Sequence, residues 1–456
     1  MTYSYRIALI FLLGFFIDCV NIFMSAIALP DIANQMSVSE SHVAWVANSY
    51  ILGLTLIIPI SSWLAERFGT RQIMSVSMLL FSLAALFSGL AENFYSLIGW
   101  RFVQGLGGGL IIPVGQALTF SLFKQHERAK ISTLVMSVAL IAPAISPSLG
   151  GAIVDHYSWR WVFLSNIPFS LLASILSLIW LGNNEKIVAR KPDLKGLLLV
   201  SLALVCLLVG LSTYADSTSQ WLPFIALFCG GLFTVFYIRH YRHEQDAILD
   251  LAIMKNTRMC FSVWIYHAIP GVFTGVNLLN IFYLQQQLGW SAEKTGSLMI
   301  LYAVGAFGAI LVCGKVYNRL GAYRLFLCGL ILHAVGIALL STINHTHDLF
   351  GLVVAYLLMG IGGGIGANTA QTTALIDFAG EQLSRASVIW NLNRQMSFSI
   401  GAALFTMIFN VLQQKFISTH AYHLTFVLAA ILGLLPLIGL NQLKKRVEKV
   451  CKRNEN

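Results

Sequence analysis

The sequence contains fourteen apolar stretches, each close to the ~20 residues that a helix needs to cross a bilayer. Hydrophobic residues make up 57% of the 456-residue chain and charged residues 11%, against about 25% charged in soluble domains. The stretches lack the alternation of apolar and polar residues that marks a transmembrane strand. We therefore expect an all-α integral membrane protein. The expected spans are 7–29, 43–65, 72–91, 97–123, 131–154, 160–182, 194–214, 221–239, 259–284, 294–313, 323–342, 348–372, 386–410 and 421–441.

Positive charge gathers in the loops on one side of these stretches. Most of the 29 lysines and arginines fall at the N-terminus, in even-numbered loops or in the C-terminal tail, whereas Arg160, Lys294 and Lys415 lie on the other side. The positive-inside rule then places both termini in the cytoplasm and makes the number of spans even. The net charge of +10 is a topology signal. No nucleic-acid partner is expected, because the charges are spread over many loops instead of one face.

Two short motifs occur twice in the chain at nearly the same separation. The turn at Ser62–Arg71 (SWLAERFGTR) returns in degraded form from Gly314, 252 residues later. The segment Gln104–Gly109 (QGLGGG) is echoed by Met359–Gly364 (MGIGGG), 255 residues later. Two motifs at one offset indicate an internal duplication. Related halves in a membrane protein favour a transporter whose substrate path lies between them.

The offset exceeds the length of six spans, and two inserted spans account for the excess. Polar, charged linkers near 183–195 and 239–258 bracket the seventh and eighth stretches. We therefore expect a 6+2+6 layout without a separate soluble domain. The expected parts are an N-terminal six-helix bundle (1–182), a linker with two additional helices (183–258), a C-terminal six-helix bundle (259–441) and a basic cytoplasmic tail (442–456).

Several segments resemble the signatures of a known family. The turn at Ser62–Arg71 resembles the signature between spans two and three of the major facilitator superfamily. Arg101–Gly105 (RFVQG) and Ala142–Gly151 resemble the span-four and span-five motifs of its drug–proton antiporters. Three further segments are similar to the fourteen-span drug–proton antiporters (EmrB/QacA type): Trp159–Pro168 (WRWVFLSNIP), Pro192–Gly196 (PDLKG) and Asn391–Gln395 (NLNRQ). The resemblance covers essentially the whole chain.

This resemblance implies a major facilitator fold and proton-driven export of a lipophilic small molecule by alternating access. It implies a bacterial cytoplasmic (inner) membrane, with substrate, protons and membrane lipid as partners, and it leaves open a periplasmic adaptor. A multidrug pump and a dedicated exporter of one natural metabolite, such as a siderophore, are the two alternatives. No cofactor is expected, because the sequence has no Walker loop. No metal site is expected, since the seven cysteines lack metal-ligand spacing.

Other classes of membrane protein are disfavoured. A membrane enzyme would need a nucleophile with its base or a set of metal ligands. The sequence has no Ser-His-Asp arrangement, no His-Glu-x-x-His motif and no pair of aspartates at membrane depth. A channel or a receptor without transport activity is the remaining alternative.

Arg101 lies inside the fourth expected span, where a cation costs about 2.5–3.5 kcal/mol on insertion scales and needs a partner. Asp18, in the first span, is the clearly intramembrane carboxylate of the first half. We hypothesise that Asp18 carries the proton while Arg101 tunes its protonation. The family motif places Asn21, one turn after Asp18, at the position that usually holds the acid. A purely structural Asp18–Arg101 pair is one alternative, and Asp155 is a rival proton site.

The resemblance also gives the repeated turn a gating role. In the family, charges of this turn pair with a neighbouring helix on the inner face and latch the outward-open state. A surface salt bridge is worth about 0–1 kcal/mol, which suits a latch that opens in each cycle. The alternative is that these charges only determine topology. The expected gating residues are Glu66, Arg67, Gly69 and Arg71 in the first copy, and Gly314, Asn318 and Arg319 in the second.

The two halves are not expected to be equivalent, because Asn318 stands where the first copy has Glu66. We expect proton coupling in the first half and substrate discrimination in the second.

The fifth span carries the antiporter motif residues Pro143, Pro147, Gly150 and Gly151, which predict a kinked, closely packed helix.

Polar residues within the spans are the candidates for a substrate cavity. Arg394 matches the family motif and either contacts an anionic or carbonyl-rich substrate or joins helices through backbone carbonyls. Spans nine to fourteen lack acidic residues away from the loops, which disfavours dedicated recognition of dications. The candidate cavity residues are Asn21, Gln104, His267, Asn277, Asn280, Gln285, Asn391 and Arg394.

Overall fold

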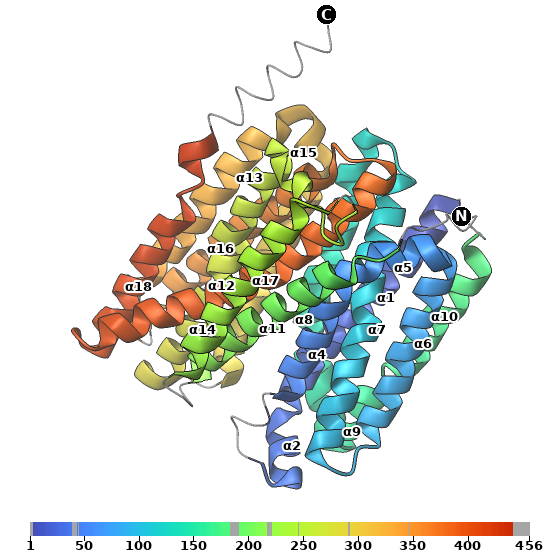
Figure 1. The fold of residues 1–456 in the computed structure, drawn as a ribbon. Coiled ribbons are helices and arrows are strands. Elements are labelled where there is room, and N and C mark those ends of the chain that lie inside the picture. The colour runs from blue at the N-terminus through green and yellow to red at the C-terminus, as the bar shows by residue number, and fades with distance from the viewer. Residues whose placement is uncertain are drawn as a thin grey trace, which may run out of the picture. The chain divides into compact units, whose positions relative to one another are not determined.

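The computed structural model describes residues 3–38, 43, 45–182, 191–216, 221–244, 246–290, 292–345 and 347–440 (Figure 1). Helices dominate these residues and no strand occurs among them, which confirms the predicted all-α class. Contacts divide the chain into two compact units. The first unit contains 1–124, 141–251 and 378–392, and the second contains 125–140, 252–377 and 393–456.

The first unit holds the helices of the N-terminal part of the chain and the two that follow them. They are α1 (Tyr3–Ile27), α2 (Leu29–Met36), α4 (Trp45–Ile57), the 3₁₀ turn η1 (Ile58–Ile60), α5 (Ser61–Phe68), α6 (Thr70–Gly89), α7 (Phe94–Ser121), α9 (Trp159–Leu164), α10 (Ile167–Trp180), α11 (Leu194–Asp216) and α12 (Leu222–Tyr241). Within it, α7 packs against α4 and α6, and α11 packs against α12.

The second unit holds the remaining helices. They are the 3₁₀ turns η2 (Gln125–Glu127) and η3 (Leu251–Lys255), α13 (Thr257–Tyr266), the π-helical turn η4 (His267–Gly271), α14 (Val272–Phe282), the π-helical turn η5 (Tyr283–Gln287), α15 (Ala292–Leu340), α16 (Leu349–Leu375) and α18 (Ser418–Gly433). Two long helices are shared between the units: α8 (Arg128–His156) divides after residue 140 and α17 (Gly380–Gln413) after residue 392.

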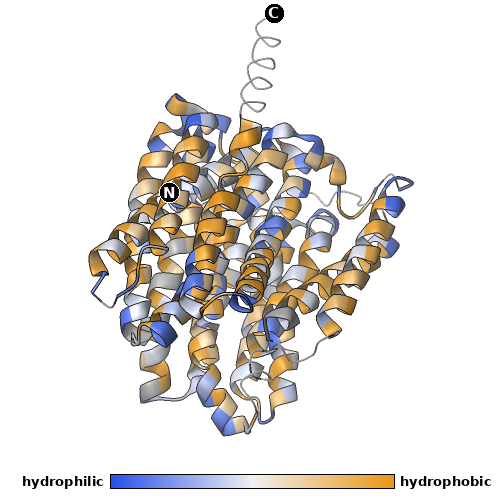
Figure 2. Cartoon of the chain, turned by 90° about the vertical axis from the view of Figure 1, so that its left-hand side faces the viewer, coloured by the Kyte–Doolittle hydropathy of each residue, from blue (hydrophilic) through white to orange (hydrophobic). Residues whose placement is uncertain are grey.

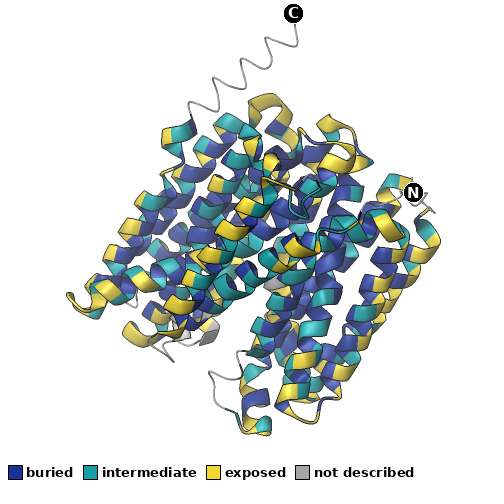
Figure 3. Cartoon of the chain, viewed as in Figure 1, coloured by how far each residue is buried: buried dark blue, intermediate teal, exposed yellow. Residues whose placement is uncertain are grey.

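The chain is a multi-pass membrane protein. Twelve helices among the described residues are long and apolar enough to cross a membrane. Figure 2 shows these helices largely orange along their lengths. Large apolar side chains are also exposed on them, such as Leu79, Leu83 and Phe87 of α6, and Figure 3 shows exposed strips along α6 and α10. Apolar side chains on both inner and outer faces fit helices that are surrounded by lipid.

The duplicated glycine motif packs the same way in both units. A Cβ atom on Gly107 of α7 would lie 2.7 Å from the backbone nitrogen of Phe81 in α6. A Cβ atom on Gly362 of α16 would lie 2.8 Å from the Cα atom of His333 in α15. Neither space admits a side chain, so in each unit two helix backbones touch directly. The sequence repeat is therefore a repeat of helix packing.

The duplicated turn also keeps its backbone conformation. Gly69, between α5 and α6, has φ 86° and ψ 141°, and Gly321, 252 residues later, has φ 74° and ψ 163°. A side chain disfavours this region of φ/ψ space, which explains glycine at both positions. The backbone at Gly321 is not helical, so α15 consists of two helices joined at this residue.

Candidate functional site

Arg101 of α7 is completely buried and is held by four hydrogen bonds. Its Nε donates to the carbonyl of Val46 at 3.0 Å, and its Nη1 donates to Asn21 Oδ1 at 3.0 Å and Gln104 Oε1 at 2.7 Å. Its Nη2 donates to Ser25 Oγ at 3.2 Å. Helices α1, α4 and α7 thus supply neutral oxygens to a buried cation. Asn21 and Gln104, predicted as cavity residues, belong to this cluster.

Tyr50 of α4 links Arg101 to Asp18. Its buried hydroxyl donates a hydrogen bond to Asp18 Oδ1, and the guanidinium carbon of Arg101 lies 4.5 Å from the centroid of its ring. Asp18 is 2% exposed and interacts electrostatically with Arg101. The structure therefore brings Asp18, Asn21 and Arg101 together, and their roles stay predictions. The sequence offered no sign of the role of Tyr50, because one tyrosine within an apolar run carries no signal.

The second unit has a neutral network at the equivalent place. Tyr356 of α16 lies 255 residues after Arg101 and is 1% exposed. Asn280 Nδ2 donates to its hydroxyl at 2.9 Å, and the hydroxyl donates to Asn277 Oδ1 at 3.2 Å. The predicted cavity residues Asn277 and Asn280 thus lie together around a tyrosine. Charge is buried in the first repeat and absent from this position in the second.

A second equivalence supports this asymmetry. Tyr302 of α15 follows Tyr50 by 252 residues, and each tyrosine lies beside a glycine of the duplicated motif. Tyr302 stacks on Phe273 with ring centroids 4.0 Å apart, whereas Tyr50 bonds to Asp18. An aromatic ring takes the place of the carboxylate partner in the second unit.

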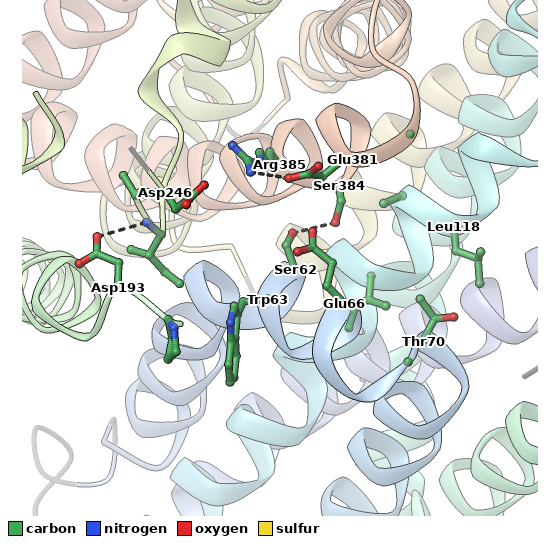
Figure 4. Close-up of a pocket in the computed structure, with 18 of the residues that line it drawn as sticks. Ser62, Trp63, Glu66, Thr70, Leu118, Asp193, Asp246, Glu381, Ser384 and Arg385 are labelled. Atoms are coloured by element: carbon green, nitrogen blue, oxygen red, sulfur yellow. Dashed lines mark hydrogen bonds and ion pairs between the residues drawn. The ribbon is translucent and has the colours of Figure 1, made fainter. Parts of the chain in front are cut away.

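The first copy of the basic turn faces the start of α17. Ser62 Oγ and Ser384 Oγ lie 2.8 Å apart, and half-buried Glu66 is repelled by Glu381 and attracted by Arg385 (Figure 4). Arg385 forms an ion pair with Glu381. We name this contact between α5 and the first residues of α17 (380–385) the inner contact. Arg67 in the same turn is exposed and Arg71 is half-buried.

The inner contact borders a cavity of about 720 Å³. Its walls come from α5, the end of α7, the start of α17 and two linker segments, 191–193 and 246–248. Figure 4 shows Glu66, Glu381 and Arg385 on one side and Asp193 on another. All of these residues belong to the first unit. Glu381 and Arg385 escaped the sequence analysis because they are 315 or more residues from Glu66 and belong to no recognised motif.

The second copy of the turn faces the start of α8. Exposed Asn318 donates through Nδ2 to the carbonyl of His126 at 2.8 Å. A Cβ atom on Gly314 would lie 3.1 Å from Thr133 Cβ, and Arg319 is exposed. Because α8 and α17 begin 252 residues apart, the two copies of the turn face equivalent helix starts. A neutral hydrogen bond replaces the charged contact in the second copy.

The antiporter motif lies in α8, which is helical from Arg128 to His156. The side chains of Pro143, Pro147 and Asp155 lie outside the described part of the structure, and the kink stays a prediction. A Cβ atom on Gly150 would make an ordinary contact with α1, 3.4 Å from Met24 Cα. Gly151 has no other atom within 4 Å of such a Cβ, so of these two glycines Gly150 is the one that lies against α1.

The remaining predicted cavity residues lie in separate places. Asn391 of α17 is buried and donates to Gln116 Oε1 at 2.7 Å, within the first unit. His267 lies in the π-helical turn η4, at the edge of an apolar crevice of about 410 Å³ in the second unit. Gln285, in η5, and Arg394, in α17, are half-buried.

Comparison with known proteins identifies the family. The sequence profile of the Major Facilitator Superfamily matches residues 11–242 and 263–453. The chain belongs to this superfamily. It is therefore a membrane transporter of small molecules and not an enzyme.

Relatives of this transporter share its length. A protein from Enterobacter sp. (strain 638) with the provisional name multidrug resistance protein MdtD is 26% identical to this chain, over 93% of this chain and 92% of its own. The protein of that name from Salmonella heidelberg (strain SL476) is 28% identical, with the same coverage. The one from Cronobacter sakazakii (strain ATCC BAA-894) is 28% identical over 86% of this chain and 83% of its own.

Solved structures of low sequence identity share the fold of this transporter. The human organic anion transporter MFSD10 (TETRAN) superimposes with a TM-score of 0.69 at 12% identity, over 96% of this chain and 100% of that one. The proton:xylose symporter XylE gives a TM-score of 0.65 at 14% identity, over 96% and 95%. At these identities the likeness concerns the fold alone.

Proposed function

We propose that this transporter exports a lipophilic small molecule from the bacterial cytoplasm in exchange for protons, by alternating access across the inner membrane. The observation that carries the proposal is the buried cluster of Asp18, Tyr50 and Arg101. Ionisable groups at membrane depth are costly and mark proton and substrate pathways. The names of the MdtD relatives support a drug or toxic compound as the substrate.

The cluster has the chemistry to hold and release one proton. When Asp18 is ionised, its negative charge offsets Arg101, and the Tyr50 hydroxyl donates to it. When Asp18 takes up a proton, Arg101 is left as an uncompensated buried charge. The four hydrogen bonds to neutral oxygens remain, but they do not cancel the charge of Arg101. A conformation that lets water or substrate reach the cluster is then favoured, and this difference couples proton binding to conformation.

The inner contact and its neutral counterpart at Asn318 act in this proposal as gates that open in each cycle. The ion pairs of Arg385 with Glu381 and Asp250 are partly exposed, so each is worth at most about 1 kcal/mol. A weak contact of this kind can close the inner side without trapping the transporter there.

We further propose fourteen spans in a 6+2+6 layout with both termini in the cytoplasm. The twelve candidate spans include the 47-residue segment Lys294–Leu340. As one helix it would be about 70 Å long, more than twice the hydrocarbon core. It breaks at Gly321 and so supports two spans. The 29-residue α8 is a further span beyond the twelve. The layout divides the chain at 182, 258 and 441, and the expected tail (442–456) lies outside the described residues.

Transport by purified protein in proteoliposomes tests the proposal. An imposed proton gradient is expected to drive accumulation of a lipophilic dye without ATP. Asp18→Asn is expected to abolish the driven flux while dye binding is retained. The matched control is Asp31→Asn, which neutralises an exposed acid of α2. If driven flux persists with Asp18 neutralised, the proton assignment is wrong.

A further inference from the structure

The segment that follows α12, residues 246–250, is fixed to that helix. The Tyr237 hydroxyl donates to the carbonyl of Leu249 at 2.7 Å and accepts from its backbone nitrogen at 2.9 Å. The Tyr241 hydroxyl donates to Asp250 Oδ1 at 3.1 Å. Two tyrosines from successive turns of α12 thus set the position of both the backbone and the acid. We name residues 246–250 the strut.

The start of α11 holds the strut from a second direction. Asp193 Oδ2 accepts from the backbone nitrogen of Ile248 at 3.3 Å, and Oδ1 accepts from the backbone nitrogen of Gly196 at 2.8 Å. His240 Nε2 of α12 lies 2.8 Å from Asp193 Oδ1. The Asp193 side chain is 4% exposed. This buried carboxylate joins both inserted helices and the strut into one braced element.

Asp193 and His240 could also bind a metal together with Glu244, since their ligand atoms all lie within 4.8 Å of one another. The hydrogen bonds already made by Asp193 account for its burial without an ion. We therefore assign this group a structural role in bracing the strut.

The strut reaches the inner contact. Asp250 Oδ2 lies 3.5 Å from Arg385 Nη1, and Arg385 also pairs with Glu381 and interacts with Glu66. Strut residues 246–248 line the same 720 Å³ cavity as Ser62 and Ser384 (Figure 4). Asp250 therefore pairs with Arg385 of the inner contact near this cavity. In addition, α11 packs against α4 and η1, which lead into α5.

A purely space-filling role for the inserted helices does not explain this arrangement. Only 17% of the apolar window of α12 and 33% of that of α11 is buried, so most of their surface faces outward. Their polar bonds instead hold the backbone of Ile248 and Leu249 and the side chain of Asp250, which lies beside the arginine of the inner contact. We propose that α11 and α12 use the strut to position Arg385 and so favour closure of the inner contact. The inference depends on the proposed function only in treating that contact as a gate.

Cross-linking of the contact itself tests the inference. Ser62→Cys with Ser384→Cys replaces two hydroxyls that are 2.8 Å apart, and the rate of disulfide formation under a mild oxidant reports how often the contact is closed. The full-length protein is used in native membranes, without substrate or proton gradient. In this background we expect Asp250→Asn to slow cross-linking about 1.5- to 5-fold, the fold-change that corresponds to a partly exposed ion pair.

Matched variants separate positioning from misfolding. Asp250→Glu is expected to restore most of the rate, and Tyr241→Phe to lower it by a smaller factor. Asp250→Asn is expected to add nothing once Arg385→Gln is present. The control Glu92→Gln neutralises an exposed acid between α6 and α7 and should leave the rate unchanged. Equal rates in the unaltered background, Asp250→Asn and Tyr241→Phe would overturn the inference.

The readout distinguishes this inference from the proposed function. If the unaltered protein shows no driven export but cross-linking still depends on Asp250, the inference about the strut is supported and the transport proposal is wrong. If export is proton-driven but cross-linking is independent of Asp250, the strut is wrong. In a protein active in export, Asp250→Asn is further expected to change the maximal rate and leave the KM for substrate unchanged, because the bonds described for the strut lead to α11, α12 and Arg385.

Discussion

Gly107→Ala is expected to destabilise the first unit, because the added methyl has no space between α7 and α6. The new Cβ would lie 2.7 Å from the backbone nitrogen of Phe81 and 3.0 Å from the carbonyl oxygen of Ser77, whereas ordinary contacts begin at 3.4 Å. Both obstacles are backbone atoms, which cannot rotate away. The two helices must therefore move apart by about 0.7 Å.

The cost follows from two contributions. Overpacking of a tight interface costs about 1–3 kcal/mol. The Ser77 hydroxyl also donates to the carbonyl of Gly107 at 2.6 Å, and loss of this bond adds about 0.5–1.5 kcal/mol. We expect a total of about 2–4 kcal/mol, or a fall in Tm of several degrees at about 2–4 °C per kcal/mol.

Thermal unfolding in detergent, followed by the loss of monodisperse protein, measures this effect. Gly99→Ala is the matched control: it makes the same change in the same helix, with no other atom within 4 Å of the new Cβ. Because alanine favours helix over glycine by up to about 1 kcal/mol, this control should be neutral or slightly stabilising. Gly362→Ala, at the equivalent contact of the second unit, should resemble Gly107→Ala. The same Tm for Gly107→Ala and Gly99→Ala would refute the packing argument.

Three further predictions concern single positions. Arg101→Lys should lower the Tm and stop export, because three ammonium protons cannot replace four hydrogen bonds and each buried acceptor left unpaired costs about 1–3 kcal/mol. The control is Arg67→Lys, at an exposed site. Full export by Arg101→Lys would contradict the prediction. Gly321→Ala should lower the Tm, because a side chain at φ 74° costs about 1–3 kcal/mol of backbone strain. Gly308→Ala, also in α15, should leave the Tm unchanged, because the new Cβ has no other atom within 4 Å. The backbone amides of Asn344 and His345 lower the pKa of Asp348. Ionised Asp348 should therefore stabilise the protein above its unfolded pKa of about 3.9, and this stabilisation should be lost as the pH falls through its lower folded-state pKa. The Tm of Asp348→Asn, measured against pH, should not show this loss.

The sequence alone predicted the spans well wherever an apolar run was uninterrupted. The expected stretches 194–214 and 221–239 correspond to α11 (Leu194–Asp216) and α12 (Leu222–Tyr241). Hydrophobic length is a local property, so no tertiary contact is needed to recognise it. Irregular elements escaped this reasoning. The separate short helix α2 and the π-helical turns η4 and η5 lie within or beside apolar runs that gave no sign of them.

The same limit applies to the site. Asp18 and Arg101 were recognisable one by one, because a charge within an apolar run stands out against its neighbours. Their mediator Tyr50, and the partners Glu381 and Arg385 of the first turn, became visible only in the fold. These residues are ordinary in their local sequence, and their roles depend on contacts between segments far apart in the chain.

Consecutive residues were enough to predict a helical membrane transporter built from two related halves, because hydrophobic length, loop charge and repeated motifs are local properties of a sequence. The tertiary structure decided how the halves differ. Equivalent positions hold Arg101 in one and Tyr356 in the other, and the carboxylate partner of Tyr50 is replaced by a ring stacked on Tyr302. It also decided that Tyr241 of α12 is joined to Arg385 through Asp250. Such pairings depend on which helix faces are brought together, and no local pattern of residues specifies that.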